Sequence, residues 1–253
     1  MTHVYAVANQ KGGVGKTTTV VSVAAYIAAA QRRVLVVDID PQANATTSLG
    51  VDRDTVRRSI YESIVGDMPM ERALMLTQRL GLDLVPSTPA LAGAEVELVG
   101  MIARERRLQK SLGSLRGRYE YILIDCPPSL GLLTINALTA ADQVIIPVQC
   151  EYLPMEGLAQ LLRTIELVRA NLNSSLGIKG LLMTMYDVRT NLAQQVVDEV
   201  RSHFADKTFR TVIPRSVRLS EAPSYGEPIM DYAPRSPGAV AYQALAREIM
   251  NSD

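Results

Sequence analysis

A glycine-rich segment near the start of the chain, residues 11–18 (Lys-Gly-Gly-Val-Gly-Lys-Thr-Thr), carries the residues best suited to phosphate chemistry. Its glycines let backbone N–H groups turn toward an anion without hindrance from a Cβ atom. Lys16 would then contact the β- and γ-phosphates of a nucleotide, and the Thr17 hydroxyl would bind a Mg²⁺ ion. A glycine-rich turn that binds nothing is a poor alternative, because these residue types have no packing use together. The predicted nucleotide-binding residues of the segment are Lys11, Gly12, Gly13, Gly15, Lys16, Thr17 and Thr18.

This segment requires a strand before it and a helix after it. The apolar run at 4–8 predicts the strand, and the apolar stretch at 19–30 predicts the helix, whose positive N-terminal end favours an anion. The usual P-loop pattern has a glycine where Gln10 stands, so the segment departs from it. A second lysine, Lys11, follows instead.

Two further predicted strands end in carboxylates. Residues 34–38 lead to Asp40 and Pro41, and Pro41 prevents further regular strand pairing. Residues 121–125 end at Asp125 in the manner of a Walker B strand. Ligands of open α/β sheets bind at the carboxyl edge, so Thr17, Asp40 and Asp125 are the predicted Mg²⁺ residues, partly through water. A strand-end or helix-capping role for both carboxylates remains the alternative.

The alternation of strands and helices predicts an α/β fold. Strands are predicted at 4–8, 34–38, 82–85, 121–125, 143–148, 178–185 and 211–213, and helices at about 16–31, 91–113, 155–172, 192–203 and 238–250. We therefore expect a single domain, residues 1–253, with a mostly parallel twisted sheet of 7–8 strands covered by helices on both faces. The chain has 253 residues, 47% of them hydrophobic, which suffices for one large core.

Several features predict a cytoplasmic protein. The first predicted strand starts at residue 4, which leaves no room for a signal peptide or an N-terminal DNA-binding helix-turn-helix domain. No apolar stretch reaches the roughly 18 residues of a membrane span. Cys126 and Cys150 stand at predicted strand ends and are expected to be buried, reduced thiols. His3 and His203 are isolated and indicate no further metal site.

The motif K-G-G-x-G-K-T-T directly after the first strand resembles that of the deviant Walker A ATPases. This group includes ParA/Soj partitioning proteins, MinD-type septum-site regulators, nitrogenase iron proteins and arsenic-pump ATPases. The resemblance covers residues 3–250 and implies a P-loop NTPase that binds ATP and Mg²⁺. It also implies that Lys11 reaches across an ATP-dependent homodimer to the partner subunit's ATP.

The C-terminal helix distinguishes between two branches of this group. MinD-type proteins attach to membranes through a basic amphipathic helix, but the last helix here has one basic residue, Arg247, offset by Glu248. The two cysteines do not lie in the glycine-rich settings that nitrogenase iron proteins use. The sequence therefore favours the partitioning branch, with no membrane contact expected. A MinD-like membrane-associated switch in division-site placement, and a scaffold that retains ATP with little hydrolysis, remain alternatives.

The charge distribution indicates a DNA surface although the net charge is zero, with 26 basic and 26 acidic residues. Residues 163–218 hold 9 Lys/Arg against 5 Asp/Glu, a weak signal by itself. The segments 186–192 and 212–223 resemble those that separate short Soj-type ParA proteins from MinD. The resemblance implies that Arg189 and Arg218 grip DNA phosphates without reading the base sequence. Ion pairs of Arg189 with Asp187 and of Arg218 with Glu221 remain the alternative.

The resemblance also implies a mechanism. Pro214 and Ser216 would contact the adenine, Asp40 would position or activate the attacking water, and Lys11 and Lys16 would neutralise charge on the transferred phosphoryl group. The ATP dimer would bind double-stranded DNA, and hydrolysis, weak alone and stimulated by a ParB-type centromere-binding protein, would release it. This implies a cytoplasmic, nucleoid-associated protein that segregates a chromosome or plasmid. One local departure is Ala43, which stands where a glycine is common in the family.

Overall fold

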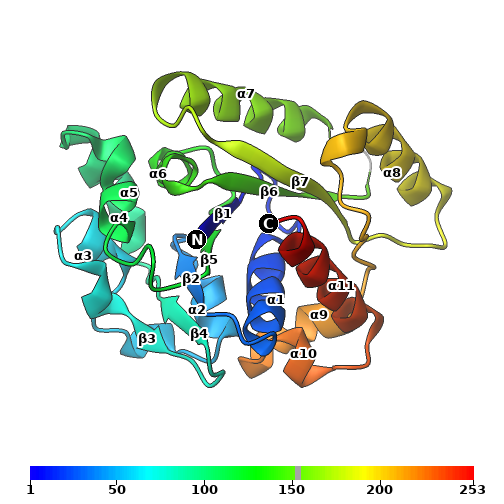
Figure 1. Cartoon of the computed structure of the whole chain (residues 1–253), viewed down its shortest axis with the longest axis horizontal. Helices are drawn as coiled ribbons and strands as arrows, with labels where there is room; N and C mark the ends of the chain where they lie inside the picture. The colour runs from blue at the N-terminus through cyan, green and yellow to red at the C-terminus, as the bar shows by residue number, and fades with distance from the viewer. Residues whose placement is uncertain (152–154) are drawn as a thin grey trace.

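The computed structural model describes residues 1–151 and 155–253, which form one seven-stranded sheet flanked by helices (Figure 1). The strand order is β3-β4-β2-β5-β1-β6-β7, and only β3 runs antiparallel to its neighbour. The strands are β1 (His3–Val7), β2 (Val34–Asp38), β3 (Met75–Leu76), β4 (Leu82–Val85), β5 (Tyr121–Asp125), β6 (Gln143–Gln149) and β7 (Gly177–Thr184). The predicted mostly parallel sheet of 7–8 strands is confirmed.

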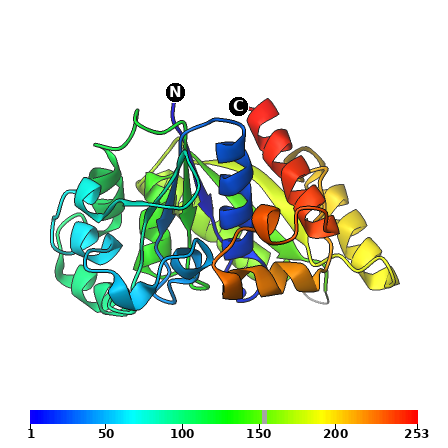
Figure 2. The same ribbon diagram turned by 90° about the horizontal axis from the view of Figure 1, so that it is seen from below.

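Helices cover both faces of the sheet, as predicted (Figures 1 and 2). They are α1 (Lys16–Ala29), α2 (Asn44–Ser48), α3 (Ile60–Ile64), α4 (Leu91–Glu97), α5 (Arg107–Leu112), α6 (Leu132–Ala140), α7 (Met155–Asn171), α8 (Asn191–His203), α9 (Val217–Glu221), α10 (Ile229–Tyr232) and α11 (Pro237–Asn251). One hydrophobic core includes residues of α3 to α8, and the other residues of α1, α2, α10 and α11. All residues of β2 and β5 are buried, as expected for parallel strands covered on both faces.

The prediction of one helix over residues 91–113 is wrong. The segment contains α4, two short 3₁₀ turns and α5. Ala103 adopts φ 53°, in the left-handed region, so the chain turns there before α5 begins at Arg107. A periodic apolar pattern runs through this break because α4 and α5 both pack against the same core.

The predicted strand at 211–213 is also wrong. Met185 adopts φ 53° directly after β7 ends, so its backbone leaves the extended conformation. The Ile213 N–H still donates to the Met183 carbonyl (2.9 Å), but only isolated bridges form, such as that between Tyr186 and Pro214. The segment therefore runs beside the sheet without adding a strand to it.

The amino ends of the strands hold a buried polar cluster that fastens the C-terminal end of the chain. Lys179 and Asp253 form an ion pair whose side chains are each only 6% exposed, and the Tyr5 hydroxyl donates to the same carboxylate. The rings of His3, Tyr5 and Tyr121 stack on one another beside this pair. Burial, together with the Asp253 charge, raises the pKa of Tyr121 to about 12. The cluster anchors the end of the chain after α11 to the sheet.

Candidate active site

The predicted phosphate loop lies between β1 and α1, at the carboxyl edge of the sheet. Gly13 and Gly15 adopt φ 72° and 89°, in the left-handed region that favours glycine. A Cβ at residue 13 would meet no atom within 4 Å, so the backbone conformation, and not space, requires the glycine there. The loop therefore has the irregular backbone that aims N–H groups at an anion.

Asn9 fixes the start of this loop and was not singled out from the sequence. Its side-chain amide donates to the Pro147 carbonyl on β6 (2.7 Å), and its side-chain oxygen accepts from the Lys11 N–H (3.0 Å). The side chain thus joins the loop to the neighbouring strand in a buried setting. A polar residue directly after a buried strand was the available signal.

The two lysines of the loop lie in different surroundings. Lys16 is buried, and its Nζ donates to the Lys11 carbonyl (3.0 Å). Burial lowers the pKa of Lys16, while the charges of Asp125 and Asp40 oppose that shift. Lys11, in contrast, is exposed. Lys16 is therefore placed to act within its own subunit, whereas Lys11 can meet a second molecule.

Asp125 lies below the loop at the end of β5. The Thr17 hydroxyl donates to its Oδ2 (2.7 Å), while its Oδ1 is buried without a hydrogen-bond partner in the described part of the chain. The β2–β5 register places Asp38 beside Asp125. Burial, and then the Asp38 charge, raise the pKa of Asp125 well above its ordinary value. A buried carboxylate with an unpaired oxygen is a site that a cation would stabilise.

Asp38 is the main site residue that the sequence reasoning missed. It is fully buried and accepts hydrogen bonds from the Thr46 N–H (2.8 Å), the Thr46 hydroxyl (2.7 Å) and the Asp40 N–H (3.1 Å). Burial raises the pKa of Asp38 to about 7. Asp40, itself buried, accepts from the Gln42 N–H (2.9 Å). Asp38 thus ties α2 and the backbone of Asp40 to the sheet, and the pair of aspartates in the sequence was its signal.

The predicted Mg²⁺ residues fit a metal that is only partly held by protein. Among residues 1–151 and 155–253, no group of three or more His, Cys, Asp or Glu side chains is arranged to hold a metal ion. Mg²⁺ keeps several waters and often binds through one carboxylate together with substrate phosphates. The Thr17 hydroxyl and the unpaired oxygen of Asp125 suit that mode, and Asp40 would act through water.

A cavity of about 360 Å³ extends from the phosphate loop toward the C-terminal third of the chain. Gly15 and Thr18 line one side, and Pro214 and Ser216 line another. Tyr242 of α11 also lines it, with its hydroxyl 3.1 Å from that of Thr19, and was not singled out from the sequence. The structure therefore brings the predicted adenine residues and the phosphate loop to one cavity.

The two predicted DNA-binding arginines lie outside this cavity and are ion-paired. Arg189 forms two hydrogen bonds to Asp187 (2.6 and 2.8 Å), and Arg218 forms one to Glu221 (2.9 Å). The guanidinium of Arg189 holds the pKa of Asp187 well below its usual range. Both arginine side chains are exposed, at 81% and 61%. The ion pairs that the sequence left open as an alternative therefore occur, and a DNA role remains a prediction.

Comparison with known proteins gives the family. A family model described as an AAA domain matches residues 2–178. The sporulation initiation inhibitor protein Soj of Bacillus subtilis is 55% identical over 249 residues, covering 98% of this chain and 98% of Soj. The chromosome partitioning protein ParA of Myxococcus xanthus is 53% identical over 247 residues, covering 98% of this chain and 87% of that protein. The chain belongs to the ParA/Soj family of partitioning ATPases. The predicted resemblance is thereby confirmed.

A solved structure that contains a nucleotide is also similar to this chain. A protein of Mycobacterium smegmatis, named cobyrinic acid a,c-diamide synthase and solved with bound ADP and magnesium, has a TM-score of 0.86 and 42% identity. The match covers 99% of this chain and 95% of that one. A MinD-type identity for this chain is less supported, because the relatives at about half identity over the full length are ParA/Soj proteins.

Other features of this ParA/Soj chain can be compared with the sequence predictions. Cys126 and Cys150 are buried free thiols, as predicted, and burial raises the pKa of Cys150 to about 12. Ala43 adopts φ 54°, which explains why glycine suits this position in the family. No helix in the described part of the chain has both the length and the apolar character needed to cross a membrane.

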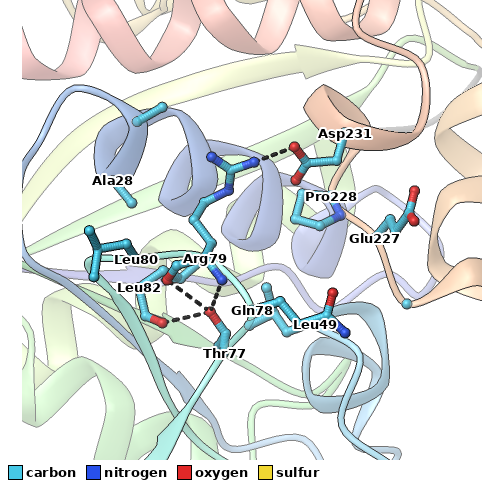
Figure 3. A pocket seen from close by; sticks show the side chains of 12 residues that line it. Ala28, Leu49, Thr77, Gln78, Arg79, Leu80, Leu82, Glu227, Pro228 and Asp231 are labelled. Atoms are coloured by element: carbon cyan, nitrogen blue, oxygen red, sulfur yellow. Dashed lines mark hydrogen bonds and ion pairs between the residues drawn. The ribbon is translucent and has the colours of Figure 1, made fainter.

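A second cavity of about 400 Å³ lies at the far end of α1 and is separate from the phosphate loop (Figure 3). It is lined by Ala28, by the 77–82 loop and by the 226–231 segment. Arg79 and Asp231 form an ion pair across it, and the Thr77 hydroxyl donates to the Leu82 carbonyl (2.7 Å). No residue of the phosphate loop lines it, so we assign it no part in phosphate binding.

Proposed function

We propose that this chain is an ATP-driven DNA-partitioning protein, one domain over residues 1–253, that works as a nucleotide-gated clamp. Its ATP-bound homodimer binds double-stranded DNA without sequence preference and leaves the DNA after hydrolysis. The main support is the cavity that the phosphate loop shares with Pro214 and Ser216. Next to Lys16 of that loop, the Thr17 hydroxyl donates to the buried Asp125, and Asp40 is buried as well. The ParA/Soj likeness over nearly the whole chain supports the same conclusion.

The phosphate loop binds the nucleotide. Backbone N–H groups around Gly13 and Gly15 surround the phosphates, and the buried Lys16 ammonium moves from the Lys11 carbonyl to the β- and γ-phosphates. Thr17 and Asp125 would hold Mg²⁺, which would neutralise charge on the phosphates.

Asp40 serves the attacking water. Its backbone N–H is fixed by Asp38 and its own carboxylate accepts from Gln42, so the side chain is held at the edge of the site before any nucleotide enters. A carboxylate in this place orients a water and accepts its proton. Asp40, Lys11 and Lys16 are thus the proposed catalytic residues.

Lys11 makes the dimer depend on ATP. Its side chain is exposed while its N–H is fastened to Asn9, so the loop presents an ammonium group away from its own core. In a face-to-face dimer this group reaches the partner's γ-phosphate, a contact that ADP does not provide. ATP therefore favours the dimer by differential binding.

Dimerisation brings two copies of Arg189 and Arg218 together for DNA. When the arginines of one subunit bind DNA, those of the other subunit are held close to it at a high effective concentration. Two weak phosphate contacts then bind more tightly together than either does alone. A ParB-type centromere-binding protein stimulates hydrolysis, and the nucleoid is the place of action. A MinD-like membrane switch is the alternative function.

A co-sedimentation experiment with the full chain tests this proposal. With ATP and Mg²⁺ we expect binding to unrelated duplex DNA sequences and none to anionic lipid vesicles, and with ADP we expect neither. The matched control is Lys16→Ala, which should lose the ATP-dependent binding. Binding to vesicles and not to DNA would establish the MinD-like alternative instead.

A further inference from the structure

Three arginines line a cavity of about 440 Å³ beside the edge strand β3. Arg57 and Arg58 come from the segment before α3, and Arg72 from the segment that leads into β3. The remaining wall is mostly apolar, with Val56 and Leu74 among its residues. In Figure 1, β3 lies on the opposite side of the molecule from α8, so this cavity is far from the Arg189 end of the sheet.

None of these three guanidinium groups forms an ion pair with a residue in the described ranges. Three carboxylates close to these arginines in sequence have other partners. Glu62 accepts from the N–H and hydroxyl of Ser59 in a capping box, and Asp67 pairs with Arg107 and Lys110. Glu71 is held by Ser114 and lies near the Arg118 charge, which lowers its pKa. Asp54, in the same segment as Arg57, forms no ion pair with the described residues either.

Three like charges line one cavity whose wall contains no carboxylate, so they repel one another and an anion there is stabilising. Guanidinium groups present a planar fork of donors that matches phosphate oxygens. All three arginines are exposed, as is required to reach the backbone of a large polyanion. Arg189 and Arg218, in contrast, must give up or share a carboxylate before they can bind phosphate.

We propose that the cavity lined by Arg57, Arg58 and Arg72 is a second surface for the phosphate backbone of duplex DNA. This inference rests on the proposed DNA-binding function and adds a binding surface at the opposite edge of the sheet. Since the contacts are to phosphates, they supply affinity and salt dependence but no sequence preference.

The test is a salt titration of duplex binding by the full chain in ATP and Mg²⁺. The triple variant Arg57→Gln, Arg58→Gln, Arg72→Gln is compared with a matched triple variant, Arg33→Gln, Arg235→Gln, Arg247→Gln, which removes three exposed arginines elsewhere. Removal of one arginine–phosphate interaction flattens the slope of log K against log salt by about 0.9. One such interaction in each subunit therefore predicts a slope flatter by at least about 1.8 for the first variant and an unchanged slope for the second.

The remaining outcomes separate this inference from the proposed function. A parent chain that binds DNA, with an unchanged slope in the Arg57 variant, overturns this inference alone, whereas a parent that binds no DNA overturns both. Absence of the ATP dimer in light scattering would assign the arginines to the subunit interface and not to DNA. If the parent unexpectedly binds anionic vesicles and the Arg57 variant loses this binding with an unchanged DNA slope, the arginines belong to a membrane surface and the inference is overturned.

Discussion

The phosphate-loop edge of the sheet and the two exposed arginines Arg189 and Arg218, together called the rim below, hold their charged groups in opposite ways. At the loop edge, Lys16 and Asp125 are buried and contact residues that are distant in sequence or in the adjoining loop. At the rim, Arg189 and Arg218 are exposed and contact carboxylates only two or three residues away. Buried polar groups are costly without partners, so the loop geometry is set by the fold, whereas exposed ion pairs contribute little and can be exchanged. The candidate nucleotide site is thus formed before a nucleotide binds. Arg189 and Arg218, in contrast, can exchange their carboxylate partners for another anion.

The largest expected effect is that of Lys16→Ala, which removes a buried charged group from the phosphate loop. Removing a charged phosphate ligand should weaken ATP binding by at least about 2 kcal/mol, roughly 30-fold, and abolish ATP-dependent dimers. Calorimetry measures the affinity, with Arg247→Ala, an exposed residue outside the site, as the control that should keep it. Near-normal affinity in Lys16→Ala would remove that lysine from the site.

The second prediction separates hydrolysis from dimerisation, using two residues at the phosphate-loop edge of the sheet. Asp40→Ala should bind ATP and accumulate as a dimer that turns over slowly, because the group that serves the water is gone. Lys11→Ala should bind nucleotide but stay monomeric, since its exposed ammonium is the cross-subunit contact. Light scattering in ATP gives both masses, and a monomeric Asp40 variant with a dimeric Lys11 variant would reverse these roles.

The third prediction concerns the cost of burying carboxylates. Folding raises the pKa of Asp38 from 3.8 to about 7, so between these values the native state binds a proton that the unfolded chain has released. The free-energy cost of keeping an ionised Asp38 buried is therefore absent at pH 4 and grows as the pH rises to 7, so the free energy of unfolding falls over this range. Without nucleotide, the melting temperature of the parent relative to Asp38→Asn should fall by several degrees over this range, at about 2–4 °C per kcal/mol. A constant difference between the two would show that Asp38 does not titrate there.

The smallest effects are expected for the ion pair of Arg189 with Asp187. Substituting one partner and then the other should change DNA binding in opposite directions. Arg189→Ala should flatten the slope of log K against log salt for DNA by about 1.8, one phosphate interaction in each subunit. Asp187→Asn should do the reverse and strengthen DNA binding, because it releases the same guanidinium. If Asp187→Asn leaves the affinity unchanged or lower, Arg189 is a structural partner of Asp187 and not a phosphate ligand.

The same contrast explains what the sequence could predict. The sequence predicts the phosphate loop because a phosphate cradle needs particular residues at fixed spacing, and it predicts Asp40 and Asp125 because they follow buried strands. The strands of the sheet were recognisable because a covered parallel strand is apolar throughout. Asp38 and Tyr242 were missed because their roles depend on strand register and on a cavity shared by distant segments.

The rest could not be read from local pattern. The break between α4 and α5 depends on a left-handed Ala103, which no periodicity reveals. Whether Arg57 is ion-paired depends on which carboxylates the fold places near it, and equal numbers of acidic and basic residues along the chain do not reveal that. The pair of Arg189 with Asp187 is local, and the sequence offered it as an alternative.

The ion pair of Lys179 and Asp253 has a mechanical consequence. Any force applied at Asp253, by a surface tether or by a bulky fused protein, would act on this pair and on the Tyr5 hydroxyl, and through them directly on β7 and β1. α11, which brings Tyr242 to the nucleotide cavity, would be loaded next. Probes attached at that end would therefore disturb nucleotide binding unless the linker is long and slack, so that it transmits no force to α11.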